Sequence, residues 1–185
     1  MEKMLDSAYK ALRFFTDNIV GYFAALVMLG ATGLALVEIG RRYLLGVTFH
    51  WGQDAVTYFI VGSISLFFAV TQARRSHLAM SVVLDVLKAK GKLRSVMCIR
   101  ALVSFLSLCF YVAFAWWGWP TVERAWMMGT TTQSMLLMMW PFQFMLLSGF
   151  VLMALTTAFQ LYQDVQAIFG RKVFPWAATE EGLEI

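Results

Sequence analysis

The chain has 185 residues, of which 60% are apolar or aromatic and 14% are charged, and its formal net charge is +4. A soluble domain of this length cannot bury so much hydrocarbon in one core, so the composition excludes an ordinary soluble protein and predicts that lipid covers part of the surface. The two cysteines form no CxxC pair, and neither a disulfide framework nor a zinc site is expected.

Uncharged apolar windows predict the four transmembrane helices of an all-α integral membrane protein. A helix rises about 1.5 Å per residue and the hydrocarbon layer is about 30 Å thick, so each span needs about 20 residues. Windows of this length place the spans at about 19–40, 55–73, 101–121 and 140–162. Residues 1–185 then form a single membrane domain, with no room for an additional soluble one.

A break before the last span is predicted from local sequence. Gly129 is flexible and the three threonines after it are β-branched, and both residue types disfavour a helix. Pro141 suits the first turn of a new helix, where its missing N–H costs nothing. Residues 123–140 are therefore expected to form an irregular segment at the outer membrane surface.

The distribution of Lys and Arg predicts the orientation of the chain. The N-terminal tail, the segment 74–100 and the C-terminal tail lie on one side and carry twelve of the 15 basic residues. The opposite loops carry Arg41, Arg42 and Arg124. Because basic residues concentrate on the cytoplasmic side of membrane proteins, both termini are expected in the cytoplasm, N-in and C-in.

Two segments beside the spans have the spacing of amphipathic helices. In residues 3–18 and 78–90, apolar side chains recur every three or four positions, with charged or polar side chains on the rest of the turn. Both segments are expected to lie flat in the headgroup layer with the apolar side inward. For the first of them, a helix that extends into water fits the pattern as well.

Charged and aromatic side chains at the ends of the spans are the candidate functional residues. Glu38 closes the first span, and Arg42 lies four residues further along a continuing helix, so the two can pair. A buried acid in a membrane is also a candidate for ion or proton coupling, which leaves Glu38 two alternative roles. No catalytic, cofactor-binding or metal-binding residue is expected. The candidates for structural contacts or a partner interface are Glu38, Arg41, Arg42, Trp51, Asp54, Arg74, Arg75, His77, Glu123 and Arg124.

The positions of the two histidines argue against a haem protein. His50 falls in the loop between the first two spans, and His77 falls beyond the opposite end of the second span. A haem held by two histidines needs both at matching depths on facing helices. A membrane anchor of a haem- or quinone-linked redox enzyme stays as an alternative function, and so does a small homodimeric exporter that uses Glu38.

Short motifs around the spans resemble those of a known family. In chain order they are Glu38-x-x-Arg41-Arg42-Tyr43, Trp51-x-x-Asp54, Arg74-Arg75-x-His77-Leu78, Gly129-Thr130-Thr131 and Trp140-Pro141. Their order and spacing around four spans resemble the small membrane subunit (DctQ-type) of tripartite ATP-independent periplasmic (TRAP) transporters. The chain departs from the family pattern after the tryptophan of the first loop, where Gln53-Asp54 replaces the common Glu, and ahead of the last helix, where residues 133–136 contain no proline.

The resemblance implies a non-catalytic part in a secondary transporter of the bacterial inner membrane. Such a subunit packs beside a large membrane subunit, enlarges its static scaffold and helps to dock a soluble periplasmic substrate-binding protein. The large subunit carries an organic acid together with sodium ions. Membrane lipid is the remaining neighbour that the resemblance implies, and neither a cofactor nor nucleic acid is expected.

Overall fold

The computed structural model describes residues 2–74, 93–134 and 136–169. These residues form helices and connecting turns, and they contain no strand apart from one isolated bridge. Four helical stretches within them are long and apolar enough to cross a membrane, which confirms the expected all-α membrane fold. The four stretches are Met4–Leu44, Gly52–Ala73, Val96–Met127 and Trp140–Ile168.

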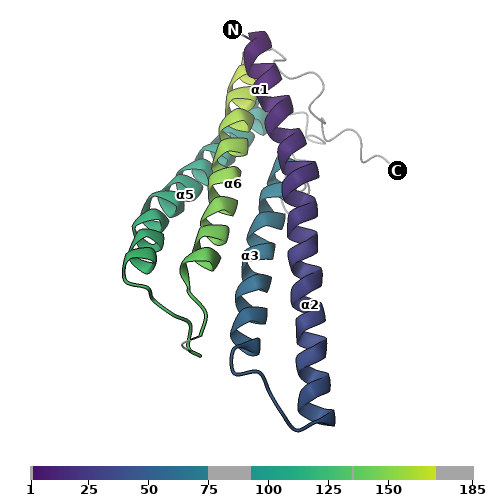
Figure 1. The fold of residues 1–185 in the computed structure, drawn as a ribbon. Coiled ribbons are helices and arrows are strands. Elements are labelled where there is room, and N and C mark those ends of the chain that lie inside the picture. The colour runs from purple at the N-terminus through teal and green to yellow at the C-terminus, as the bar shows by residue number, and fades with distance from the viewer. Residues whose placement is uncertain (1, 75–92, 135, 170–185) are drawn as a thin grey trace, which may run out of the picture.

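The N-terminal part of the chain is one continuous helical rod (Figure 1). It consists of α1 (Glu2–Phe14), a π-helical stretch η1 (Phe15–Val20) and α2 (Gly21–Leu44). A candidate span of 41 residues lies within it, and at the rise of a helix this is about 60 Å, about twice the hydrocarbon thickness. In α1, Tyr9 is buried and stacks on Phe159 with ring centroids 5.4 Å apart. The structure therefore favours a first segment that continues the span and packs on another helix. The second amphipathic segment, 78–90, lies outside the described residues.

The helices stand side by side in an open row and do not close into a bundle (Figure 1). α3 (Gly52–Ala73) lies between α2 and α6 (Trp140–Ile168), and α5 (Leu93–Met127) packs on the other side of α6. Within the most apolar 18-residue window of α3 and of α6, 33% of the residues are buried inside the structure. The corresponding shares are 17% for the N-terminal rod and 6% for α5. α3 and α6 are thus the inner pair, and the two outer helices present most of their surface to the surroundings.

Small residues hold the inner pair at close range. A Cβ atom placed on Gly149 of α6 would lie 2.8 Å from the carbonyl oxygen of Ser65 in α3, so only glycine fits there. Across the same contact, the Ser65 hydroxyl donates to the carbonyl oxygen of Leu146 at 3.0 Å. The two backbones are therefore in direct contact at this point.

Glycines in the left-handed conformation end both helices that run toward the loops. Gly46 follows α2 with φ 65°, and Gly129 follows α5 with φ 59°. After α5, the N–H groups of Gly129 and Thr130 donate to the carbonyl oxygens of Trp126 and Ala125 at 3.4 and 3.2 Å. These bonds satisfy carbonyl groups that the end of a helix would otherwise leave unpaired.

α5 is longer than the span expected at 101–121, because the helix continues through Pro120 to Met127. Proline removes one backbone hydrogen bond, but membrane helices tolerate it where side chains satisfy the freed groups. Beyond the proline, the Nε–H of Arg124 donates to the carbonyl oxygen of Pro120 at 3.2 Å within the same helix. The irregular segment expected at 123–140 therefore shortens to residues 128–139, and Pro141 lies in the first turn of α6.

Candidate functional site

Most of the candidate residues gather at one end of the helical row. The loops 45–51 and 128–139 both lie at this end, which we call the loop end (Figure 1). Arg74 lies at the opposite end of the row, at the C-terminus of α3, while Arg75 and His77 lie outside the described residues. The candidates at or near the loop end are Glu38, Arg41, Arg42, Trp51, Asp54, Glu123 and Arg124.

Glu38 holds the loop between α2 and α3. Its side chain is 8% exposed, and its two carboxylate oxygens accept from the backbone N–H of Phe49 at 3.2 and 3.1 Å. A Cβ atom on Gly52 would lie 2.9 Å from Oε2 of Glu38, so a glycine at the start of α3 lets the acid approach the backbone. Hydrogen bonds to a charged group contribute about 1.5–3 kcal/mol, more than neutral ones. Glu38 therefore fixes the path of the chain from one helix to the next.

Within residues 2–74, the ion pair expected between Glu38 and Arg42 is absent, and Arg42 is exposed. The loop turns back over the end of α2, so the N–H of Phe49 reaches the carboxylate first. The neighbouring cation, Arg41, instead lies over the ring of Phe49, with its guanidinium carbon 3.7 Å from the ring centroid. The ring of Phe49 also contacts Trp51, with the two centroids 5.3 Å apart. Two of the candidate residues, Arg41 and Trp51, therefore contact the same phenylalanine ring in the loop.

Asp54 joins α3 to the loop between α5 and α6. Its Oδ2 accepts from the backbone N–H of Ser134 at 2.8 Å. That loop is folded back on itself, since the N–H of Thr132 donates to the carbonyl oxygen of Leu137 at 2.8 Å. Asp54 therefore links the α2–α3 half of the row to the α5–α6 half at the loop end.

Replacing Asp54 with alanine is expected to loosen the 128–139 loop. The N–H of Ser134 loses a charged acceptor, and the bond it makes is worth about 1.5–3 kcal/mol. Amide hydrogen exchange of residues 130–138 is therefore expected to accelerate by about tenfold or more, since 1.4 kcal/mol corresponds to a factor of ten. Asp54→Asn keeps a carbonyl acceptor and serves as the matched control. Identical exchange in Asp54→Ala and the unmodified protein would contradict this role.

At the opposite end of the row, Arg74 pairs with the N-terminal rod. Its Nε–H donates to Oδ1 of Asp17 at 3.1 Å, and Arg13 lies 3.6 Å from the other carboxylate oxygen of Asp17. The side chain of Arg74 is 56% exposed, so this pair contributes little to stability. The pair is one of the contacts between α3 and the rod.

A buried amide cluster between α3 and α6 was not predicted from the sequence. The Nε2 group of Gln72 donates to Oγ1 of Thr157 at 3.0 Å and to Oε1 of Gln160 at 3.1 Å. Nε2 of Gln160 returns a bond to the carbonyl oxygen of Gln72 at 2.7 Å. Nearer the end of α6, the buried Asp164 accepts from the Ser104 hydroxyl of α5 at 2.6 Å. The available signal was the presence of glutamines inside apolar windows, which indicates contact between helices because lipid offers an amide no partner.

These contacts share one chemical character. Glu38 and Asp54 both accept from backbone N–H groups, and the glutamines bond across neighbouring helices. Each polar group therefore holds one segment of the chain against another. Exposed charges that can meet another molecule at the loop end are Arg42, Glu123 and Arg124. The arrangement suits a rigid frame with a charged end.

Comparison with known proteins gives one family match. The matching family is described as tripartite ATP-independent periplasmic transporters, DctQ component, and its model covers residues 31–167, well over half of the chain. The matched region runs from the middle of α2 to the last turn of α6. No curated protein and no solved structure gives a significant match.

Proposed function

Because the chain belongs to the DctQ component family of the tripartite ATP-independent periplasmic transporters, we propose that it is the non-catalytic small membrane subunit of such a transporter. In this role it packs beside the large membrane subunit and widens the fixed scaffold against which that subunit moves. It also helps to dock the periplasmic substrate-binding protein, for sodium-coupled uptake of an organic acid. It resides in the bacterial inner membrane with both termini in the cytoplasm.

The open row of helices is the observation that supports this proposal most directly. A carrier that works alone encloses its polar path between helices near the middle of the membrane. In the described part of this chain, α2 and α5 each have a neighbour on one side only, and their outer faces are apolar. Such a row leaves membrane-embedded surface for another membrane protein to cover.

The bonds within the row also suit a support. A moving subunit needs a reference whose helices keep their spacing. The Gln72 cluster and the close approach of Gly149 to Ser65 fix α3 against α6, and Asp54 fixes α3 to the last loop. The chain therefore provides a stiff layer that resists tilting.

Docking of the soluble protein is assigned to the loop end. With both termini in the cytoplasm, the loops 45–51 and 128–139 face the periplasm. Exposed side chains of both charges lie there, including Arg42 and Glu123, and His50 is exposed as well. Charged rims of this kind steer association and orient a partner.

Co-purification tests the subunit role. A tagged chain extracted from its native membrane in mild detergent is expected to bring with it one large, many-span membrane protein in stoichiometric amount. Liposomes that hold this chain alone are expected to take up no organic acid, whereas liposomes with both membrane subunits do so when sodium and the binding protein are present. A Soret absorption band, a flavin-containing partner or uptake by the chain alone would overturn the proposal in favour of a redox anchor or a self-sufficient carrier.

A further inference from the structure

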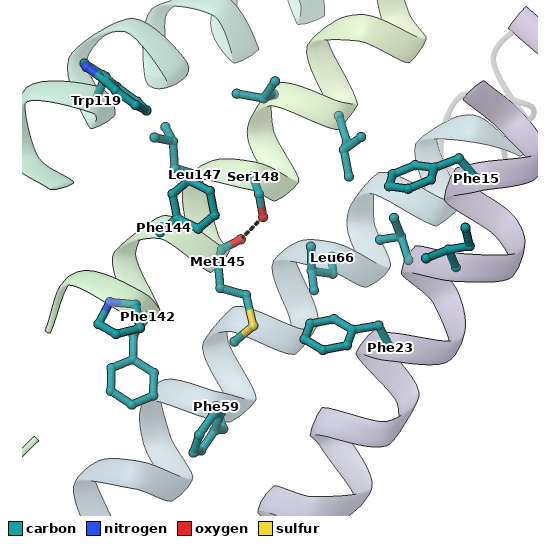
Figure 2. Close-up of a pocket in the computed structure, with 15 residues that line it drawn as sticks. Phe15, Phe23, Phe59, Leu66, Trp119, Phe142, Phe144, Met145, Leu147 and Ser148 are labelled. Carbon is teal, nitrogen blue, oxygen red and sulfur yellow. Dashed lines mark hydrogen bonds between the residues drawn. The ribbon is translucent and has the colours of Figure 1, made fainter. Parts of the chain in front are cut away.

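An apolar groove of about 740 Å³ opens between the N-terminal rod and α6 (Figure 2). Phe15 and Phe23 line it from the rod, Leu66 from α3 and Met145 from α6. Ser148 contributes the one hydroxyl of the lining, and it donates to the carbonyl oxygen of Met145 in its own helix at 2.7 Å. The groove therefore suits an apolar occupant.

A stripe of exposed residues, which we call the α2 stripe, begins in η1 and continues along α2 from this groove toward the loop end. Its members follow one another at alternating intervals of four and three residues, which places them on one face of the helix. Ile19 and Phe23 belong both to the stripe and to the lining of the groove. Every member is exposed or half-buried. The α2 stripe consists of Ile19, Phe23, Leu26, Gly30, Gly33, Val37, Gly40 and Leu44.

The glycines of the α2 stripe have no neighbour within the chain. A Cβ atom placed on Gly30, Gly33 or Gly40 meets no atom within 4 Å. At the helix contact inside the row the opposite holds, because a Cβ atom on Gly149 would lie 2.8 Å from the carbonyl oxygen of Ser65. Glycine inside a helix is less stable than alanine by about 1 kcal/mol. Packing within this chain offsets that cost at Gly149 but not at the stripe.

A second helix accounts for these glycines, and lipid does not. Fluid acyl chains fill the space beside alanine or leucine equally well, so a lipid-facing helix gains nothing from glycine. Two helix backbones approach closely only where Cβ atoms are absent, which is why membrane helix contacts are enriched in small residues. The intervals of three and four residues are also those of left-handed helix pairs that cross at about 20°.

The outer face of α5 provides the contrast. Its exposed side chains are large, and among them are Leu102, Leu106 and Trp117. The glycine of this helix, Gly118, turns inward, where a Cβ atom would lie 2.7 Å from Leu147 of α6. Nothing on this face favours a closely packed helix over lipid.

We propose that the α2 stripe and the adjoining groove bind a transmembrane helix of the large subunit, while the outer face of α5 meets lipid. This inference rests on the proposed function and adds to it the face at which the two membrane subunits meet. A second copy of the chain fits less well, because a two-fold contact places the same surface of both copies together. The concave groove of one copy then faces the concave groove of the other, and neither is filled.

Leucine substitutions in the stripe test the interface without disturbing the row. The Gly30→Leu/Gly33→Leu double variant adds side chains where the chain leaves open space, and leucine is the better helix former. Co-purification of the large subunit with the tagged double variant is expected to fall at least tenfold. Ala25→Leu, at an exposed position on α2 outside the stripe, and Cys109→Leu, at an exposed position on α5, are the matched controls and are expected to retain the large subunit.

Photo-crosslinking in native membranes identifies the neighbour directly. With p-benzoyl-phenylalanine in place of Val37, irradiation is expected to give an adduct that mass spectrometry assigns to the large subunit. An adduct of two copies of this chain, or lipid adducts alone, would overturn the inference, as would full recovery of the large subunit by the double variant. In those cases the proposed function stands, provided that the unmodified chain still brings down the large subunit. If the unmodified chain brings down no large subunit, the proposed function fails as well.

Discussion

Replacing Gly149 with leucine is expected to separate α3 from α6 and to lower the thermal unfolding midpoint by about 6–12 °C. A Cβ atom at this position would lie 2.8 Å from the carbonyl oxygen and 2.9 Å from the carbonyl carbon of Ser65, and backbone atoms cannot move aside as a flexible side chain does. Overpacking of this kind costs about 1–3 kcal/mol, and separation also breaks the bond from Ser65 to Leu146. A total of about 3 kcal/mol corresponds to the expected shift for a chain of this length.

The matched control for this prediction is Gly33→Leu. It makes the same chemical change on α2, where a Cβ atom meets no other atom within 4 Å. Tryptophan fluorescence during heating in mild detergent reports both midpoints for the chain purified without the large subunit. Under these conditions the control is expected to unfold at the temperature of the unmodified protein. If Gly149→Leu also unfolds at that temperature, the close approach of α3 and α6 is refuted.

Replacing Glu38 with alanine is expected to release the loop between α2 and α3. Both carboxylate oxygens accept from the N–H of Phe49. Their loss removes a hydrogen bond to a charged group, which is worth about 1.5–3 kcal/mol. The side chain is also 8% exposed, so its removal leaves space next to Gly52. Amide exchange of residues 45–52 is expected to accelerate more than tenfold, because each 1.4 kcal/mol is a factor of ten.

Glu38→Gln separates the two roles that the sequence leaves open. The amide keeps one carbonyl acceptor for Phe49, so a purely structural role predicts an intermediate rate of exchange and near-normal uptake by the assembled transporter. Ion or proton coupling predicts that uptake is lost while the loop stays protected, because the titratable group is gone. We expect intermediate exchange and near-normal uptake, because the carboxylate already accepts a hydrogen bond from the backbone N–H of Phe49.

The four helices could be predicted from the sequence because apolar length alone sets a membrane span. The helix α5 extends past the span expected at 101–121, through Pro120 to Met127. A proline inside a membrane helix is a weaker terminator than in water, because the surrounding lipid gives the backbone no alternative partner.

The candidate residues at the loop end were found from charge, but their partners were not. Glu38 bonds to the N–H of Phe49 and Asp54 to the N–H of Ser134, and a backbone N–H is present at nearly every residue. No sequence pattern shows which of these N–H groups the fold of a loop will bring close to a carboxylate. The ion pair with Arg42 was expected because it follows from helical spacing alone, whereas the actual contact depends on the course of the loop.

The open row also bears on how the chain is made. Along the sequence α5 comes before α6, yet in space α6 lies between α3 and α5, so the middle of the row is completed only once α6 has been made. Until then, Gln72 sits in a newly inserted α3 without Thr157 and Gln160, which reach it only on α6. A chain that ends before α6 thus carries an amide in a membrane helix whose bonds to α6 are not formed.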